Sequence, residues 1–248
     1  MRTTSRQRYF RWPGVAGPVA DRGGAALVAA EHTEKVSSLR MTFTGAGGFG
    51  GRGETAGSDS RILYTGEGTS SVTTVVGDRE YTTQDGRTTW KKLSDTERLA
   101  PFARSAADVV RAASKDPQVQ SIGQEKVRGV KATHYRVTLP ADGDSQSESD
   151  LTKLPESELA WFDLDNVEGY SDPVNIDIWV ADNLVRRIAT TVKDQPESSS
   201  EFYDFNTPIT ITAPEQATPA PKDAAPQVHV HQDSPTSVTA KLGYSTNE

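Results

Sequence analysis

The stretch from Ile122 to Pro140, Ile-Gly-Gln-Glu-Lys-Val-Arg-Gly-Val-Lys-Ala-Thr-His-Tyr-Arg-Val-Thr-Leu-Pro, predicts two antiparallel strands joined at Arg128-Gly129. Its second half alternates between an apolar set and a polar set, Tyr135, Val137 and Leu139 against His134, Arg136 and Thr138. A period of two is typical of an antiparallel strand with one buried face. Pro140 ends the ladder because proline has no N–H to donate. We therefore expect an antiparallel sheet built around this hairpin, with His134 facing solvent beside Arg136.

Composition limits both the fold and the partners. The chain has 248 residues, of which 34% are hydrophobic, so the core must be concentrated in the middle of the sequence. The formal net charge of −7 lacks the basic footprint of phosphate-backbone binding, and we expect no nucleic-acid partner. With no cysteine, these residues hold no disulfide, thiolate metal site or lipidated cysteine. No apolar run reaches membrane-spanning length.

The two ends of the sequence differ from its middle. Residues 1–24 begin with several arginines, like a signal peptide, but no uninterrupted apolar segment follows, and we expect disorder there. A real export signal within these residues is the alternative, and a misassigned start that replaced a true signal sequence is another. Residues 25–213 form the predicted domain. Residues 214–248 are rich in proline and alanine and are expected to be a disordered tail, with His229 and His231 incidental rather than metal-binding.

Two helices are expected. Residues 25–38 contain strong helix formers and a thin apolar stripe, which favours a helix at the surface. Residues 99–114 place apolar side chains three and four positions apart, among them Phe102 and Val109, which predicts a helix packed on the sheet.

Short strands at close spacing predict a meander over residues 60–93, with Asp85-Gly86 as a hairpin turn. Its large side chains are Leu63, Tyr64, Val72, Val75, Tyr81 and Trp90. A last hairpin spans residues 174–192. There the aliphatic row Ile176, Ile178 and Val180 points away from Asp177 and Trp179.

Two motifs are rejected on their context. Gly45, Gly47 and Gly50 match GxGxxG, but a strand-like segment follows instead of a helix whose N-terminus could hold a pyrophosphate, so we expect a flexible hairpin loop. The acidic residues of 163–172 do not match a calcium loop. We predict no cofactor and no metal site.

Three segments carry a family resemblance: Gly-Val-Lys-Ala-Thr-His-Tyr-Arg-Val from Gly129, Ile-Asp-Ile-Trp-Val-Ala-Asp-Asn-Leu-Val-Arg-Arg-Ile from Ile176, and Phe-Tyr-Asp-Phe-Asn-Thr-Pro-Ile-Thr-Ile-Thr-Ala-Pro from Phe202. Together they resemble the actinobacterial LppX/LprAFG lipoproteins, which share the fold of the carrier LolA. The resemblance implies an α+β protein with a strongly curved antiparallel sheet, a half-open barrel, whose concave face is covered by helices. The family's lipobox and cysteine are absent from these residues.

The resemblance also implies a function: a non-enzymatic, extracytoplasmic carrier that holds lipid or glycolipid acyl chains in an apolar cavity, acting as a monomer. Candidate lining residues are Leu63, Val75, Tyr81, Trp90, Phe102, Val109, Trp161 and Trp179. The alternative is an envelope sensor or protein-binding module on the same scaffold, with a protein of the envelope as partner. An enzyme centred on His134 is a more distant third.

Overall fold

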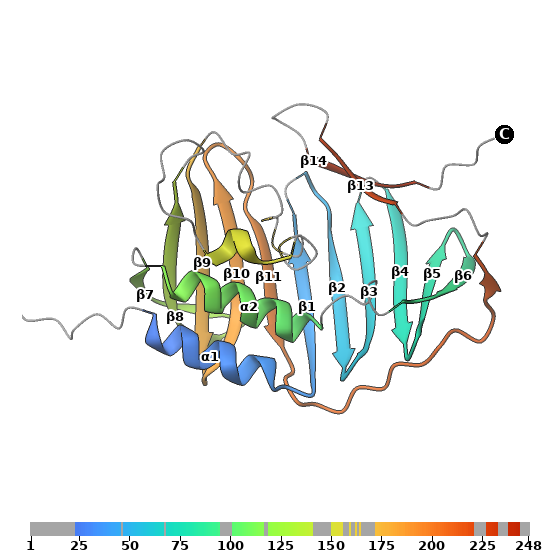
Figure 1. The fold of residues 1–248 in the computed structure, drawn as a ribbon, viewed down its shortest axis with the longest axis horizontal. Helices are drawn as coiled ribbons and strands as arrows, with labels where there is room; N and C mark the ends of the chain where they lie inside the picture. Colours follow the sequence, from blue (N-terminus) through green and yellow to red (C-terminus); the bar gives the residue numbers. More distant parts are fainter. Residues whose placement is uncertain are drawn as a thin grey trace, which may run out of the picture.

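The computed structural model describes residues 23–45, 47–66, 68–94, 101–116, 119–140, 150–155, 159, 162, 164, 172–220, 227–232 and 238–243. Within them, twelve strands form one open sheet in the order β12-β6-β5-β4-β3-β2-β1-β11-β10-β9-β8-β7 (Figure 1). All neighbouring pairs are antiparallel except β12 and β6. The predicted α+β class and half-open, curved sheet are confirmed.

The elements run as follows. The first part of the chain comprises α1 (Gly24–Glu34), β1 (Ser38–Thr44), β2 (Gly50–Ala56), β3 (Asp59–Gly66), β4 (Thr69–Val76), β5 (Arg79–Gln84), β6 (Arg87–Lys92) and α2 (Phe102–Ser114). The second part comprises β7 (Gln120–Val127), β8 (Val130–Leu139), the 3-10 helix η1 (Asp150–Lys153), β9 (Val174–Ala181), β10 (Leu184–Val192), β11 (Ser198–Tyr203), β12 (Thr218–Pro219), β13 (Gln227–Gln232) and β14 (Val238–Gly243).

Both helices lie on the same face of the sheet, in front of β8 to β11 (Figure 1). We call this the inner face and the opposite one the outer face. Small side chains on α1, Ala26, Ala29 and Ala30, are fully buried, which lets α1 lie close to α2 and the sheet. The backbone N–H of Val185 donates to Thr33 Oγ1 at 2.9 Å and ties α1 to β10. The thin apolar stripe predicted for residues 25–38 is therefore the surface through which α1 packs, and it consists largely of alanine. No helix in the described part of the chain is long and apolar enough to cross a membrane.

The glycine-rich segment differs from the prediction, because β2 begins at Gly50 and only the residues before it form the turn. A Cβ on Gly51 would lie 2.0 Å from the Leu63 carbonyl oxygen, and one on Gly53 would lie 3.1 Å from Phe102 and 3.2 Å from Met41. Glycine is needed here for close approach rather than for flexibility. The flexible loop predicted over the whole segment is corrected to a strand with missing side chains on its inner face.

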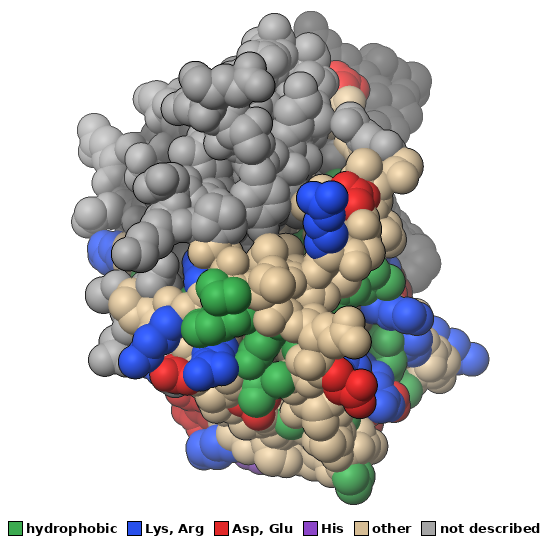
Figure 2. Space-filling view, turned by 90° about the vertical axis from the view of Figure 1, so that its right-hand side faces the viewer, with side chains coloured by type: hydrophobic (Ala, Val, Ile, Leu, Met, Phe, Trp, Pro, Cys, Tyr) green, Lys and Arg blue, Asp and Glu red, His purple; other side chains and the backbone are tan. Residues whose placement is uncertain are grey.

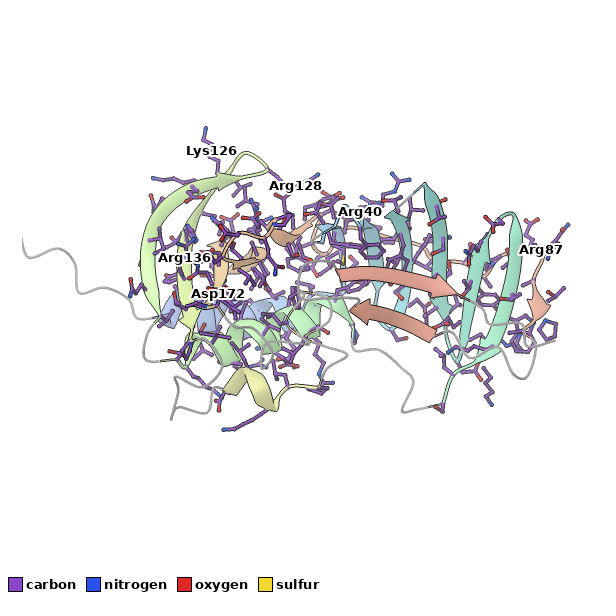
Figure 3. All side chains as sticks on the ribbon, turned by 90° about the horizontal axis from the view of Figure 1, so that it is seen from above. Arg40, Arg87, Lys126, Arg128, Arg136 and Asp172 are labelled. Carbon is purple, nitrogen blue, oxygen red and sulfur yellow. The ribbon has the colours of Figure 1, made fainter. Side chains whose placement is uncertain are left out.

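The hairpin of β7 and β8 bends towards the outer face. Seen from above, the end that carries Lys126 and Arg128 lies on the side of the sheet opposite the helices (Figure 3). An ion pair from Arg128 to Glu201 on β11, at 3.2 Å, joins the tip to the sheet. The register of β7 shifts between Ser121 and Gly123, and such a bulge allows a strand to bend.

At the other end of the sheet, Thr218 and Pro219 of β12 pair with Thr89 and Trp90 of β6. The described contacts thus continue beyond residue 213, where the predicted domain ends, while residues 1–22 lie outside the described part. Seen from this end, hydrophobic side chains are interspersed with charges of both signs (Figure 2).

Candidate functional site

The inner face holds one continuous apolar cluster. It joins residues of both helices to alternate residues of β8, β9, β10, β11 and β1, and includes Leu159, Phe162 and Leu164 from the segment after η1. Phe102 and Val109 of α2 belong to it, with 4% and 0% of their surface exposed. Burial of this kind is the main stabilising contribution to the fold.

The cluster ends over β1 to β3 in three aromatic rings, Phe43, Phe49 and Tyr64, which we call the aromatic triad. Ring centroids are 5.9 Å apart for Phe43 and Phe49 and 5.7 Å apart for each of the other two pairs. Phe49 and Tyr64 are only partly buried. Gly51 and Gly53 lie beside the triad without side chains, so this end of the inner face combines aromatic walls with small residues.

Tyr64 packs its ring against the other two rings of the triad and is screened from solvent around its phenol. Desolvation raises the pKa of its phenol, and the negative charge of Glu80 raises it further.

The structure separates the eight residues predicted to line a cavity. Val75 faces inward by register, through Ser60 and Thr55 to Leu39, and Phe102 and Val109 are in the inner cluster. The outer set comprises Leu63, Tyr81, Trp90 and Trp179, which the register places on the opposite face. These four residues therefore face away from the helices, because side chains alternate along a strand, and Trp179 lies opposite the aliphatic row of β9 as the sequence pattern predicts. Trp161 lies outside the described residues.

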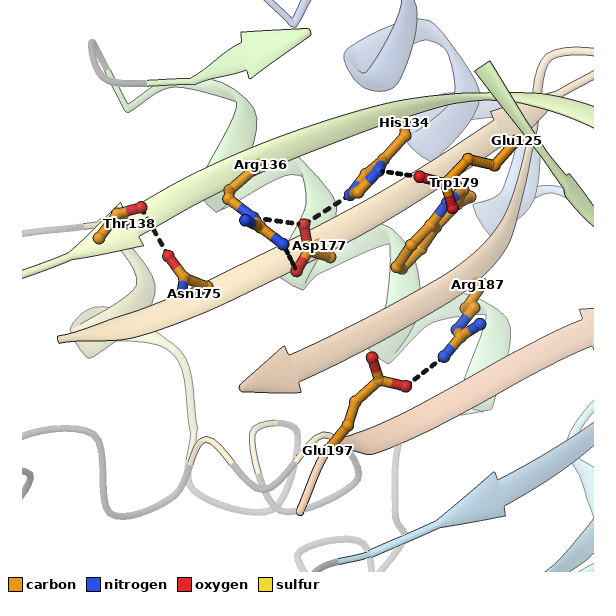
Figure 4. A network of polar contacts seen from close by, with 9 residues as sticks. All are labelled: Glu125, His134, Arg136, Thr138, Asn175, Asp177, Trp179, Arg187 and Glu197. Carbon is orange, nitrogen blue, oxygen red and sulfur yellow. Dashed lines mark hydrogen bonds and ion pairs between the residues drawn. The ribbon is translucent and has the colours of Figure 1, made fainter. Parts of the chain in front are cut away.

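The outer face carries a polar network centred on His134 (Figure 4). His134 Nε2 lies 2.5 Å from Asp177 Oδ1, and His134 Nδ1 lies 3.0 Å from Glu125 Oε1. Its ring stacks on Trp179 at 4.2 Å between centroids. With 4% of its surface exposed, His134 is buried, which corrects the expectation that it faces solvent.

Asp177 anchors the other half of this network. Arg136 donates two hydrogen bonds of 2.8 Å, one to each carboxylate oxygen, and only 2% of Asp177 is exposed. The bidentate geometry is the strongest form of this ion pair. The pairing raises the pKa of Arg136 through the hydrogen bond to Asp177, which outweighs desolvation.

Glu125 joins the hairpin to the same network. Trp179 Nε1–H donates to its carboxylate at 3.1 Å, and this bond, followed by that from His134, lowers the pKa of Glu125 below its ordinary value. Both nitrogens of His134 lie within hydrogen-bonding distance of carboxylate oxygens, and its ring stacks on Trp179. The ring is engaged on every side within the network, which suits a structural clamp.

The sequence pattern placed His134 and Asp177 on polar faces but did not show their contact. The register of β8 on β9 pairs His134 with Trp179 and Arg136 with Asp177. The sequence did carry a signal for this contact. His134 and Arg136 alternate on one strand, and Asp177 and Trp179 alternate on the strand that pairs with it.

The fold defines the class: an open, curved antiparallel sheet with two helices on one face. No protein-family model matches this sequence, and no curated protein matches it. Among solved structures, LprF from Mycobacterium bovis matches with a TM-score of 0.52 and 10% identity, over 78% of this chain and 97% of that chain. The chain thus shares the fold of LprF, and the predicted resemblance is confirmed at the level of the fold.

Two further structures match less closely. The lipoprotein LppX from Mycobacterium tuberculosis has a TM-score of 0.46 and 15% identity, over 76% of this chain and 100% of that chain. A LolA superfamily protein from Nitrosomonas europaea has a TM-score of 0.29 and 10% identity, over 78% of this chain and 96% of that chain.

Proposed function

We propose that this protein binds the acyl chains of a lipid or glycolipid on the inner face, without catalysis, as a monomeric carrier at the cell envelope. The observation that carries the proposal is the aromatic triad beside Gly51 and Gly53, at the partly buried end of the inner cluster. The LolA-like fold supports it.

The energetics favour such a ligand. Burying one methylene contributes about 0.8 kcal/mol, so a chain of about sixteen carbons contributes up to about 12 kcal/mol before ordering costs. A neutral hydrogen bond contributes about 1 kcal/mol net. Apolar area therefore decides affinity, and a binding site of this kind needs no motif of spaced polar residues.

We propose that the acyl chain enters at the aromatic triad and extends towards α2. Over β8 to β11 the inner face is closed by α1, α2 and the segment that holds Phe162. Phe49 and Tyr64 keep part of their surface exposed, so the chain meets apolar rings without first unfolding the core. Val75, Phe102 and Val109 remain the proposed lining residues on this face.

The test uses the full chain purified from a related bacterial host, with extraction of bound lipid and displacement of a fluorescent fatty acid. We expect saturable binding that Phe49→Ala weakens severalfold. Trp90→Ala is the matched control, because it removes another partly buried ring from the outer face, and it should leave binding unchanged. Folded protein that carries no lipid and takes up no fatty acid would contradict the proposal.

The second candidate, a protein-binding module, is favoured by strand β7. This strand ends the sheet, and residues 120–126 are all exposed, including Ile122 with 47% of its surface. An exposed edge can accept a strand from a partner. A partner recovered with the wild type and lost with Ile122→Lys, in a protein that takes up no lipid, would favour this function over the first.

A further inference from the structure

A hollow of about 360 Å³ opens on the outer face, where the turn between β7 and β8 meets the ends of β10 and β11. Arg128, Arg186, Tyr203 and Asp204 line its polar part, and Val127 and Val130 line its apolar part. Pockets for small ligands start at about 300 Å³, so the hollow is large enough for a small ligand. Phe202 of the inner cluster also borders the hollow, and Val127 and Val130 pack in one cluster with Trp179 of the His134 network.

A bulge in β10 places Arg186 beside the hollow. Strand β10 pairs Val185 with Val180 and then Arg187 with Trp179, so Arg186 is the extra residue. In a regular strand two consecutive residues point to opposite faces, but a bulge re-aims one of them. Arg187 stacks on Trp179 and Arg186 borders the hollow, so both guanidinium groups lie on the outer side.

Aromatic rings hold the two guanidinium groups that line the hollow. The Arg128 group lies 3.8 Å from the ring centroid of Tyr203, and the Arg186 group lies 4.9 Å from that of Phe205. Stacking uses the flat face of a guanidinium and leaves its edge, with its N–H donors, directed sideways. The rings therefore fix the positions of the two guanidinium groups and leave their N–H donors able to form hydrogen bonds.

Part of this donor capacity is unused. Arg186 donates to Asp182 at 2.9 Å through one terminal nitrogen, while its Nε is buried and has no hydrogen-bond partner within the described residues. A buried donor on a charged group without an acceptor is costly. Arg128 donates to Glu201 at 3.2 Å through one terminal nitrogen. Asp204, the acid in the wall, is paired with Arg40 at 2.9 Å, which offsets its negative charge.

The backbone at Arg128 is held in an unfavourable conformation. Its φ of +49° lies in the left-handed region, and the other non-glycine residues with positive φ in the described chain are all Asp or Asn. Asp and Asn tolerate this region better than a residue with a longer side chain does. Gly129 also has a positive φ of +83°, so the two-residue turn between β7 and β8 sets this conformation and fixes where the Arg128 side chain leaves the backbone.

We propose that this hollow binds a phosphate group, with the edges of Arg128 and Arg186 donating to its oxygens and Val127 and Val130 contacting the attached carbon skeleton. Arginine is suited to this ligand because its planar fork matches two oxygens at once. The same chemistry is offered by a soluble phosphorylated molecule and by a phospholipid headgroup. The inference does not depend on acyl-chain binding at the inner face.

The experiment records the Nε–H signals of arginine by NMR in the ¹⁵N-labelled full chain. One arm titrates inorganic phosphate and glycerol 1-phosphate. The other arm measures sedimentation with phosphatidylcholine vesicles prepared with and without phosphatidylglycerol. If the ligand is a soluble phosphorylated molecule, we expect the Arg186 signal to shift saturably in the first arm. If the ligand is a phospholipid headgroup, we expect the protein to sediment only with the vesicles that contain phosphatidylglycerol.

Variants make the test specific. Arg186→Gln and Arg128→Gln should each weaken binding about tenfold, because a hydrogen bond between charged groups contributes about 1.5 kcal/mol or more. Arg87→Gln, on the exposed start of β6, removes the same charge away from the hollow and should change affinity less than about twofold. If Arg186→Gln does not fold, the affinity of Arg128→Gln, a substitution in the exposed turn, tests the proposal. Binding in neither arm, or equal losses with Arg87→Gln, overturns the proposal.

Discussion

The two faces of strand β9 are buried to the same depth by different means. Ile176 and Ile178 on the inner face are 0% exposed, and Asp177 and Trp179 on the outer face are 2% and 5% exposed. The inner pair packs against helices, whereas the outer pair is covered by the bent hairpin and satisfied by hydrogen bonds and ring stacking. Deep burial alone therefore does not distinguish an apolar face from a polar one, and the type of contact does.

The difference has an energetic consequence. Apolar packing does not depend on the direction of a contact, so apolar groups on the inner face can pack against different apolar neighbours at similar free energy. The outer network depends on the distances among Glu125, His134 and Asp177, and a partly satisfied network is costly. We thus assign adaptability to the inner face and precise geometry to the outer one.

The largest effect is expected on the inner face. Ile178→Ala should lower the free energy of unfolding by about 3 kcal/mol, since it removes fully buried methylenes and leaves a cavity. Urea denaturation measures it. Ile122→Ala, on the exposed edge, is the control and should cost less than about 1 kcal/mol. Equal losses from the two variants would mean that the inner face is not tightly packed.

Breaking the outer network should cost somewhat less. Asp177→Ala leaves His134 and Arg136 without their shared carboxylate, and we expect a loss of about 2 kcal/mol, below the range for a fully buried pair because Arg136 is 41% exposed. Thermal and urea unfolding measure it. Retention of wild-type stability would show that the network is replaceable by solvent.

The pH dependence of Glu125 gives a smaller effect. Its lowered pKa means that the folded state favours the carboxylate. The resulting stability is present above the ordinary pKa of about 4.3 and is lost as the pH falls through the lower folded value. Trp179→Phe removes the main donor and should raise the pKa of Glu125, as measured by NMR titration of its side-chain carboxyl. An unchanged pKa would mean that the indole bond does not form in solution.

The smallest effect is expected for a surface pair. Lys92 and Asp78 lie 3.6 Å apart with side chains 75% and 51% exposed. Lys92→Ala should change the free energy of unfolding by less than about 0.5 kcal/mol, because solvent screens exposed charges. A loss comparable to that from Asp177→Ala would contradict the distinction drawn between buried and exposed ion pairs.

Much of the fold was predictable from local pattern. Alternation in β8 and β9, the Arg128-Gly129 and Asp85-Gly86 turns, and the apolar spacing of α2 all correspond to observed elements. The aromatic triad and the hollow were not predicted, since each combines residues from three or more segments. Leu63, Tyr81, Trp90 and Trp179 were named as lining candidates for their size, and only the strand register shows that they face away from the helices, as the alternation of residues 176–180 already predicted for Trp179.

By itself the sequence determined the strands, their turns and the alternation of polar and apolar residues, because these depend on neighbours a few positions apart. Only the tertiary structure decided which face of each strand packs against the helices. It also decided that a bulge places Arg186 and Arg187 on the same side and that His134 is buried. The contact of His134 with Asp177 joins residues 43 positions apart. Such contacts depend on the pairing of strands and the bend of a hairpin, which no local pattern encodes.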